Sequence, residues 1–259
     1  MHPQDKRKKQ CAQLLLPGLL LLCFGIWQGL NWLYPTSVSA DNPTEITLPE
    51  DTPSTDSKKL IALTFDDGPH PVTTPRLLDG LSQRGVHATF FLIGKQISDN
   101  AELVQTMDLM GHQIGLHTYD HVQLAGLSSS QIMRQLEDNK QVLQTLLGRS
   151  DFWVRPPYGI TDSTVENCVN APLIIWSVDP EDWRDQNADR VVEHVVSHAE
   201  DGAIILMHDI FPESVDAALR IVDELKAQGY EFVTVEEMFL ARGITPKAGE
   251  RYSSAPPAA

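Results

Sequence analysis

Short apolar runs alternate with longer amphipathic stretches along most of the chain, beginning at Lys59. The apolar runs are rich in β-branched and aromatic residues, and they predict strands at residues 60–65, 87–93, 113–117, 152–155, 173–178, 203–207 and 231–235. The amphipathic stretches predict helices at residues 75–83, 101–110, 129–147, 163–169, 188–199 and 213–227. Glycines follow several of these stretches, as at Gly148 and Gly229, and glycine commonly ends a helix because it adopts positive φ without strain. This alternation of strands and helices indicates parallel βα units.

Clusters of polar residues follow five of the predicted strands. The clusters begin at Asp66, His117, Arg155, Asp179 and His208. In a βα barrel the carboxyl ends of the strands converge on the face that holds the active site, whereas an open sheet would spread the clusters along a line. We therefore expect a barrel, with a functional site at this face.

The first 40 residues have the pattern of an export or membrane segment. A basic cluster at residues 6–9 precedes an uncharged apolar run at residues 14–34, and small residues follow at 38–40. This order fits a secretory signal peptide that is cleaved after Ala40. The apolar run has 21 residues and is also long enough to span a bilayer, and we favour a membrane anchor because the run extends past a usual signal core. Both interpretations place the rest of the chain on the extracytoplasmic side of the membrane.

Composition divides the remaining chain into three parts. Residues 41–58 are rich in Pro, Ser, Thr and acidic residues and predict a linker. Residues 243–259 hold few apolar side chains and predict a disordered tail. Residues 59–242 remain as a single α/β domain. Within it Cys168 has no partner cysteine, which predicts a buried structural thiol and no intrachain disulfide.

The chain has a net charge of −15, and this charge is unevenly distributed. Residues 1–40 hold four of the 20 Lys and Arg residues and one of the 35 acidic residues. Residues 41–259 therefore carry 16 basic and 34 acidic side chains, a net charge of −18. Nucleic-acid binding needs clustered Lys and Arg that displace counterions from phosphates. This acidic body argues against nucleic acid as a partner.

His117 and His121 are four residues apart, a spacing that allows two imidazoles to bind one metal ion. His194 and His198 have the same spacing, but they lie within a predicted amphipathic helix, where solvated histidines are the simpler interpretation. The first pair instead follows a predicted strand, on the face where the strand ends converge. His117 and His121 are therefore the candidate metal ligands.

Asp66 and Asp67 follow the first predicted strand on the same face. Thr118 stands where the HExxH metalloprotease motif has its catalytic Glu, so a general base must come from elsewhere. Two adjacent carboxylates can divide the work, one binding the metal and the other taking a proton from metal-bound water. Taken alone, an Asp-Asp-Gly sequence is more typical of a capped turn.

In these motifs the chain resembles the polysaccharide deacetylases of the NodB-homology type, carbohydrate esterase family 4. The resemblance covers roughly residues 59–240, and the five ordered motifs of that family are all present. They are T-F-D-D-G-P at 64–69, H-T-Y-D-H at 117–121, R-P-P-Y at 155–158, D-W at 182–183 and L-M-H at 206–208. The family implies a distorted (β/α)7 barrel, in agreement with the number of predicted strands.

The resemblance implies a role for each matched residue. The implied metal ligands are Asp67, His117 and His121, a set that leaves positions open for water and substrate. The implied catalytic residues are Asp66 as general base, Arg155 as the partner of that carboxylate, His208 as general acid and Asp182 as the residue that orients the acid. The implied substrate contacts are the backbone N–H of Tyr158 at the oxyanion, Trp183 and Leu206 at the acetyl pocket, and Pro157. Taken singly, Trp183 could be an ordinary core residue, His208 a satisfied buried histidine, and Arg155 and Asp182 a structural ion pair.

The resemblance implies a metal-dependent hydrolase that removes N-acetyl groups from N-acetylglucosamine units of a cell-envelope polysaccharide, either peptidoglycan or a chitin-like oligosaccharide. Zn²⁺ suits the mixed nitrogen and oxygen ligands, although Co²⁺, Ni²⁺ and Mn²⁺ also occupy such sites. The alternatives are an O-acetyl esterase acting on acetylated xylan, a catalytically inactive glycan-binding protein, and a hydrolase of small amides. We expect a monomer whose partners are an N-acetylated polysaccharide and, through the N-terminal segment, the cytoplasmic membrane.

Overall fold

The structure is a computed structural model that describes residues 58–257. The predicted signal or anchor at residues 1–40, and all but the last residue of the predicted linker, lie outside the described residues. Within residues 58–257, none of the helices is both long and apolar enough to cross a membrane.

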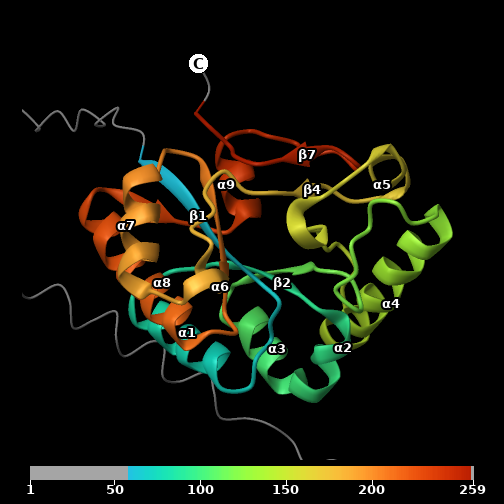
Figure 1. Ribbon diagram of the computed structural model, residues 1–259, viewed down its shortest axis with the longest axis horizontal. Coiled ribbons are helices and arrows are strands. Elements are labelled where there is room, and N and C mark those ends of the chain that lie inside the picture. The colour runs from blue at the N-terminus through green and yellow to red at the C-terminus, as the bar shows by residue number, and fades with distance from the viewer. Residues whose placement is uncertain (1–57, 258–259) are drawn as a thin grey trace, which may run out of the picture. The chain divides into compact units, whose positions relative to one another are not determined.

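Five parallel strands form the main sheet, with β1 at its centre (Figure 1). The strands are β1 (Lys59–Asp66), β2 (Thr89–Leu92), β3 (Gln113–Leu116), β5 (Ala203–His208) and β6 (Tyr230–Phe232). Their order is β3-β2-β1-β5, and β6 pairs with the first residues of β1. The register of β1 with β5 sets Asp66 opposite His208, so two predicted site residues are neighbours across one strand pair. The predicted α/β fold with a parallel sheet is confirmed.

A second, shorter pair of parallel strands consists of β4 (Leu173–Ile174) and β7 (Arg251–Tyr252). The predicted strand at 152–155 is wrong in its extent, because only Val154 makes bridges, to Leu116 and to Leu173. The predicted strand at 173–178 is likewise reduced to β4 and a single bridge from Val178 to Ile205. An apolar run of four to six residues indicates burial, but the length of its pairing depends on distant neighbours.

The six predicted helices are all present, with ends that differ from the prediction by at most two residues. They are α1 (Thr73–Gln83), α3 (Ala101–Leu109), α4 (Ser129–Leu147), α5 (Ser163–Cys168), α7 (Ala188–His198) and α8 (Pro212–Ala227). Helix α4 begins where the Gln131 side chain accepts a hydrogen bond from Ser128 N at 3.0 Å, and it ends at Gly148 with φ of 73°. Further short elements are α2 (Gly94–Ile97), α6 (Asp182–Asp185), α9 (Val235–Ala241), and the 3₁₀ turns η1 (Ser98–Asn100) and η2 (Pro157–Gly159).

The core fixes the central strand firmly. Residues 61–65 of β1 are all fully buried, and the ring of Phe65 stacks on that of Phe90 in β2 with centroids 5.2 Å apart. Helices α1, α7 and α8 lie together on one side, and α4 lies on the other (Figure 1). Gly80 lets α1 approach α8 closely, since a Cβ there would lie 2.5 Å from the methyl carbons of Leu219. Packing on several sides therefore holds the carboxyl end of β1 in place.

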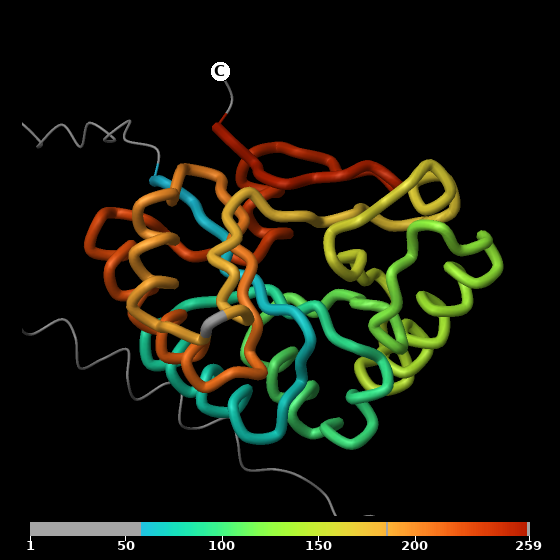
Figure 2. Tube along the Cα trace, in the orientation of Figure 1, coloured from blue at the N-terminus to red at the C-terminus, as the bar shows by residue number. Residues whose placement is uncertain are grey.

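The C-terminal segment is ordered, and the prediction of a disordered tail is wrong for residues 243–257. Figure 2 shows this segment returning to lie beside the chain that contains β4. The ring of Tyr252 packs edge-on against Phe239 at 5.2 Å, and Ala255 is fully buried, with its N–H donating to the Gly202 carbonyl at 2.8 Å. These few long-range contacts order residues 243–257, although the composition of this segment alone predicts disorder.

The predicted strand at 231–235 also ends early. Helix α9 starts after Thr234, whose hydroxyl accepts from Glu237 N at 3.1 Å, while the Glu237 carboxylate accepts from Thr234 N at 2.8 Å. This capping box gives Val235 a helical conformation.

Candidate active site

The carboxyl ends of the strands surround a pocket of about 430 Å³. Eight of the eleven predicted site residues line it: Asp66, Asp67, His117, His121, Tyr158, Trp183, Leu206 and His208. Arg155 and Asp182 are buried beside Asp66 and His208 respectively, and Pro157 is buried at the start of η2 without lining the pocket. The structure thus gathers residues from motifs that are up to 142 positions apart in the sequence, between Asp66 and His208.

Asp67, His117 and His121 form a group that can hold a metal ion. One ligand atom from each lies within 4.8 Å of the others. The Oδ1 atom of Asp67 is 3.1 Å from His121 Nε2 and 3.5 Å from His117 Nε2. This Oδ1 is buried and has no hydrogen-bond partner among the residues that the structure describes, as suits an oxygen that receives a cation.

The Nδ1 atoms of His117 and His121 each contact another group of the protein. Nδ1 of His117 lies 2.8 Å from the backbone carbonyl of Arg155, which fixes the ring with Nε2 toward Asp67. Nδ1 of His121 lies 3.5 Å from the hydroxyl of Tyr158, whose ring packs edge-on against the imidazole. Burial lowers the pKa of His121, although the charge of Asp67 raises it, and a lowered pKa favours the neutral imidazole that binds metals.

The backbone at the site is unusual. Asp67, Thr118, His121 and Tyr158 all have φ between 61° and 70°, a region that few non-glycine residues occupy. Such conformations persist where surrounding structure determines them, and they collect at functional sites. The turns after the strands therefore orient these side chains by holding the backbone in conformations that are energetically unfavourable.

Asp66 is held by a fully buried arginine. Arg155 is 0% exposed, and its Nη1 donates to Asp66 Oδ1 at 2.8 Å and to the hydroxyl of Thr64 at 2.7 Å. Its Nε and Nη2 donate to the carbonyls of residues 174 and 175, both at 3.1 Å. The guanidinium also lies 4.2 Å from the centroid of the Phe91 ring. This arrangement compensates the charge of Asp66 and leaves its Oδ2, 3.6 Å from His117 Nε2, on the pocket side.

His208 is paired with a buried carboxylate. Asp182 Oδ1 lies 2.8 Å from His208 Nδ1, and Asp182 Oδ2 accepts from the His208 backbone N–H at 2.9 Å. Burial lowers the pKa of His208, but the hydrogen bond and charge of Asp182, with the charges of Asp66 and Asp67, outweigh it and raise the pKa to about 9. A raised pKa favours the protonated imidazole, which has a proton on Nε2. Arg155 and Asp182 do not pair with each other in the part of the chain that the structure describes, so the alternative of an ion pair between them is wrong.

Apolar side chains complete the pocket. Trp183 and Leu206 line it as predicted, and Trp183 is 50% exposed, which contradicts its interpretation as an ordinary core residue. Tyr158 is 60% exposed at the same opening. A pocket with aromatic walls beside a polar floor suits a ligand that has an apolar group and several hydroxyls.

Several residues that line the pocket or support it were not predicted from the sequence as site residues. Trp176 and Phe211 line the pocket. Trp176 lies inside the predicted strand at 173–178 and Phe211 lies four residues after the predicted strand at 203–207, so nearness to a strand end is the signal that could have drawn attention to them. Asp179 was recognised at a strand end without a role; it lines the pocket, and its Oδ1 accepts from Glu181 N at 2.9 Å. Thr64 supports Arg155 from the strand that leads to the site.

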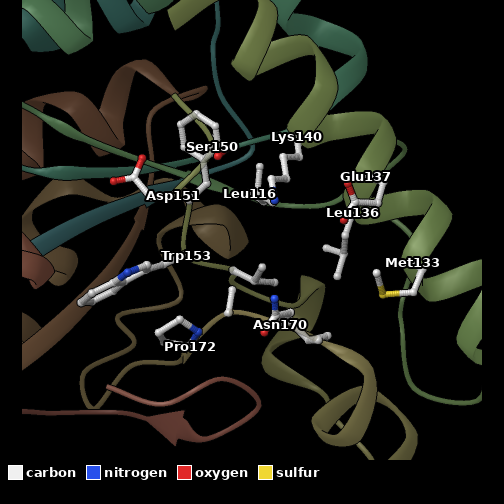
Figure 3. Close-up of a pocket in the computed structure, with 14 residues that line it drawn as sticks. Leu116, Met133, Leu136, Glu137, Lys140, Ser150, Asp151, Trp153, Asn170 and Pro172 are labelled. Atoms are coloured by element: carbon white, nitrogen blue, oxygen red, sulfur yellow. The ribbon is translucent and has the colours of Figure 1, made fainter. Parts of the chain in front are cut away.

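Other candidate groups lie outside the pocket. His194 and His198 stack on the surface of α7 with ring centroids 4.3 Å apart, and neither lines the site. Cys168 is a free thiol, half-buried rather than fully buried, and packs against the main core. A separate hollow of about 260 Å³ lies between α4 and the segments at 150–154 and 169–172 (Figure 3). It shares no lining residue with the active-site pocket.

Comparison with known proteins agrees with the site. A polysaccharide deacetylase family model matches residues 54–171. The chain is 38% identical over 190 residues to a peptidoglycan-N-acetylglucosamine deacetylase of Bacillus cereus, covering 70% of this chain and 89% of that protein. It is 38% identical over 193 residues to peptidoglycan-N-acetylmuramic acid deacetylase PdaC of Bacillus subtilis, covering 74% of this chain and 41% of PdaC. The chain therefore matches less than half the length of PdaC.

A solved structure has the same fold. The family 4 acetyl xylan esterase from Clostridium thermocellum, in complex with a cobalt ion, matches with a TM-score of 0.73 and 35% identity, over 76% of this chain and 100% of that chain. Fold and site together define an α/β protein with a hydrolase-like centre of carboxylates, histidines and a candidate metal position. The chain belongs to the polysaccharide deacetylase family.

Proposed function

We propose that this protein is a metal-dependent hydrolase that removes N-acetyl groups from N-acetylglucosamine units of peptidoglycan. The observation that carries the proposal is the arrangement of three groups around one pocket. A candidate metal-binding group at Asp67 lies next to the Asp66–Arg155 pair and the His208–Asp182 pair. Hydrolysis of an amide requires an activated water, a base and an acid for the leaving amine, and these three groups can supply them.

The donor set fits a divalent cation. Asp67, His117 and His121 would hold it, and their mixed oxygen and nitrogen atoms suit Zn²⁺, with Co²⁺ also compatible. When bound, such a cation supplies Lewis-acid polarisation of the carbonyl oxygen and lowers the pKa of water.

The protein's own residues would divide the remaining chemistry. Asp66 takes a proton from the attacking water, while Arg155 holds the carboxylate in place. The backbone N–H of Tyr158, a residue that lines the pocket, would donate to the developing oxyanion, and one such donor typically contributes about 3 kcal/mol to lowering the barrier. His208, protonated and oriented by Asp182, gives a proton to the leaving nitrogen. The products are acetate and a glucosamine unit.

Two observations support peptidoglycan as the substrate: the names of two relatives and the N-terminal sequence pattern of this chain. The B. cereus and B. subtilis relatives carry names that specify peptidoglycan substrates, and the N-terminal pattern of the present chain predicts export. A second candidate is O-deacetylation of xylan, favoured by the similarity to the acetyl xylan esterase. The intact carboxylates and histidines argue against an inactive glycan-binding protein.

We further propose that the strands close into a barrel, that the chain is anchored in the membrane and that the enzyme is a monomer. The bridges of Val154 and Val178, which connect β3 to β4 and the β4 segment to β5, support closure of the strands into a distorted (β/α)7 barrel. The apolar run at residues 14–34 supports anchoring in the cytoplasmic membrane, with the domain on the extracytoplasmic side. The molar mass of the enzyme in solution would test the proposed monomeric state.

Acetate release from peptidoglycan, chitin pentamer and acetylated xylan, measured side by side with and without a chelator, tests the proposal. We expect release from peptidoglycan, loss of activity with chelator, and recovery when Zn²⁺ or Co²⁺ is added back. Acetate from xylan alone would favour the esterase. Acetate from none of the three would favour glycan binding or hydrolysis of small amides.

A further inference from the structure

Asp209 directly follows His208 at the end of β5, yet it does not line the active-site pocket. Its side chain is 0% exposed, and its Oδ1 has no hydrogen-bond partner within residues 58–257. Burial raises the pKa of this carboxyl to about 7, although its hydrogen bond with Thr74 lowers it. Burying a carboxyl without full hydrogen bonding is costly, so the position calls for a structural or functional reason.

The Oδ2 atom of Asp209 connects β5 to the start of α1. It accepts a hydrogen bond from the hydroxyl of Thr74, which is fully buried in the first turn of α1. The same hydroxyl accepts from the His70 backbone N–H at 2.9 Å, and Thr74 N donates to the His70 carbonyl at 3.2 Å. Asp209 is thereby tied to the turn that leads from Asp67 into α1.

The Asp209 carboxyl also packs directly against that turn. A Cβ built on Gly68 would lie 2.6 Å from Asp209 Oδ1 and 2.8 Å from its Oδ2, so no side chain fits there without movement. Gly68 is the residue after Asp67, and its carbonyl accepts from Ile93 N at 3.1 Å. The turn after β1 is therefore held by the end of β5 as well as by the end of β2.

We propose that Asp209 is a positioning residue for the candidate metal site: it holds the turn after β1 so that Asp67 faces the two histidine ligands. The proposal rests on the function proposed above, in which Asp67 binds the metal. Asp67 has φ of 70°, an uncommon conformation that needs support from its surroundings. Groups that orient a metal ligand typically change metal affinity by about 10–100-fold when removed.

Calorimetric titration of the purified, metal-stripped full chain with Zn²⁺ tests the proposal without relying on turnover. We expect Asp209→Ala to weaken Zn²⁺ binding by about 10–100-fold, because it removes both the contact with Gly68 and the bond to Thr74. Asp209→Asn keeps the shape and one hydrogen-bonding oxygen, and we expect its affinity to stay within about threefold of wild type. Rescue by Asn separates positioning by shape from a requirement for the carboxylate charge.

A pair of glycine variants provides the matched control. Gly68→Ala places a methyl group against Asp209, while Gly80→Ala places one 2.5 Å from Leu219, and neither Gly80 nor Leu219 lines the active-site pocket. Both substitutions crowd a buried contact to a similar degree, so both should lower the unfolding midpoint. Zn²⁺ affinity should fall at least about tenfold in Gly68→Ala and stay within about twofold in Gly80→Ala.

The outcomes separate the two proposals. Wild-type Zn²⁺ affinity in both Asp209→Ala and Gly68→Ala would overturn the positioning role while leaving the proposed function intact. Equal losses in Gly68→Ala and Gly80→Ala would also overturn it, because the effect would then follow stability alone. Absence of Zn²⁺ binding by the wild-type chain would overturn the metal-dependent function, and the positioning role with it.

Discussion

Replacing Asp182 by Asn should move the pH dependence of the reaction, because Asp182 is the main source of the raised pKa of His208. The Asp182 side chain is 1% exposed and contacts both Nδ1 and the backbone N–H of His208, at 2.8 and 2.9 Å. Asn has nearly the same shape, so the substitution removes the charge and changes little packing. We expect the fold and the metal site to remain intact.

The magnitude follows from the pKa of His208, which is raised from 6.5 to about 9. A shift of this size corresponds to about 3 kcal/mol in favour of the protonated imidazole. A cation bound at Asp67 lowers this pKa, so the value of about 9 for the metal-free chain sets the upper limit of the effect. With a pKa near 9, about 90% of His208 is protonated at pH 8; with a pKa of 6.5, only about 3% is. Asp182→Asn should therefore reduce kcat at pH 8 by up to about 30-fold, and by much less at pH 6.

The assay is kcat for acetate release between pH 5.5 and 9.5. A general acid must be protonated, so the rate is retained below its pKa and is lost as the pH rises through it. We expect the alkaline limb of the profile to move to lower pH in Asp182→Asn. Asp189→Asn, at an exposed position of α7 that pairs with Arg220, is the matched control and should leave the profile unchanged. An alkaline limb at the same pH in wild type and Asp182→Asn would refute the assignment of His208 as general acid.

Three other substitutions have definite expected outcomes. Arg155→Met leaves the buried Asp66 carboxylate without its partner and should lower the free energy of unfolding by about 3–5 kcal/mol in urea denaturation; a loss below 1 kcal/mol would contradict this. Asp209 has a pKa raised from 3.8 to about 7, so its contribution to stability is full below about 3.8 and is lost as the pH rises through 7. Between pH 5.5 and 8.5, metal-stripped wild type should therefore lose about 2 kcal/mol more stability than Asp209→Asn, and equal losses would count against a raised pKa. Trp183→Ala should raise KM about tenfold by removing an aromatic wall, and steady-state kinetics with an unchanged KM would exclude substrate contact.

The sequence pattern predicts the site better than it predicts the strands. Polar residues at strand ends identify the site because parallel strands bring their carboxyl ends together whatever the exact pairing. The apolar run at 152–155 looks like a strand, yet only Val154 makes bridges, because pairing depends on where distant strands lie. The regular sheet accordingly has five strands, and closure into a barrel depends on the single bridges.

Long-range packing explains what composition could not predict. The segment around Tyr252 is polar, but β4 and Phe239 provide it with a strand partner and an aromatic contact. Trp176 and Phe211 lie near predicted strand ends, but whether their side chains enter the pocket depends on the path of the chain after β4 and β5, which no local pattern encodes. The start of α9 is different, since the Thr234 and Glu237 capping box is visible in the sequence and could have been recognised.

In the proposed function, Asp66 is the base of a metal-dependent deacetylase and Asp67 is a separate metal ligand. The most direct test is acetate release from peptidoglycan by purified Asp66→Asn protein, with its bound metal measured in the same sample. We predict that the variant retains metal and releases no acetate above background, while the wild-type chain does both. Wild-type activity in Asp66→Asn would contradict the role of Asp66 as the base.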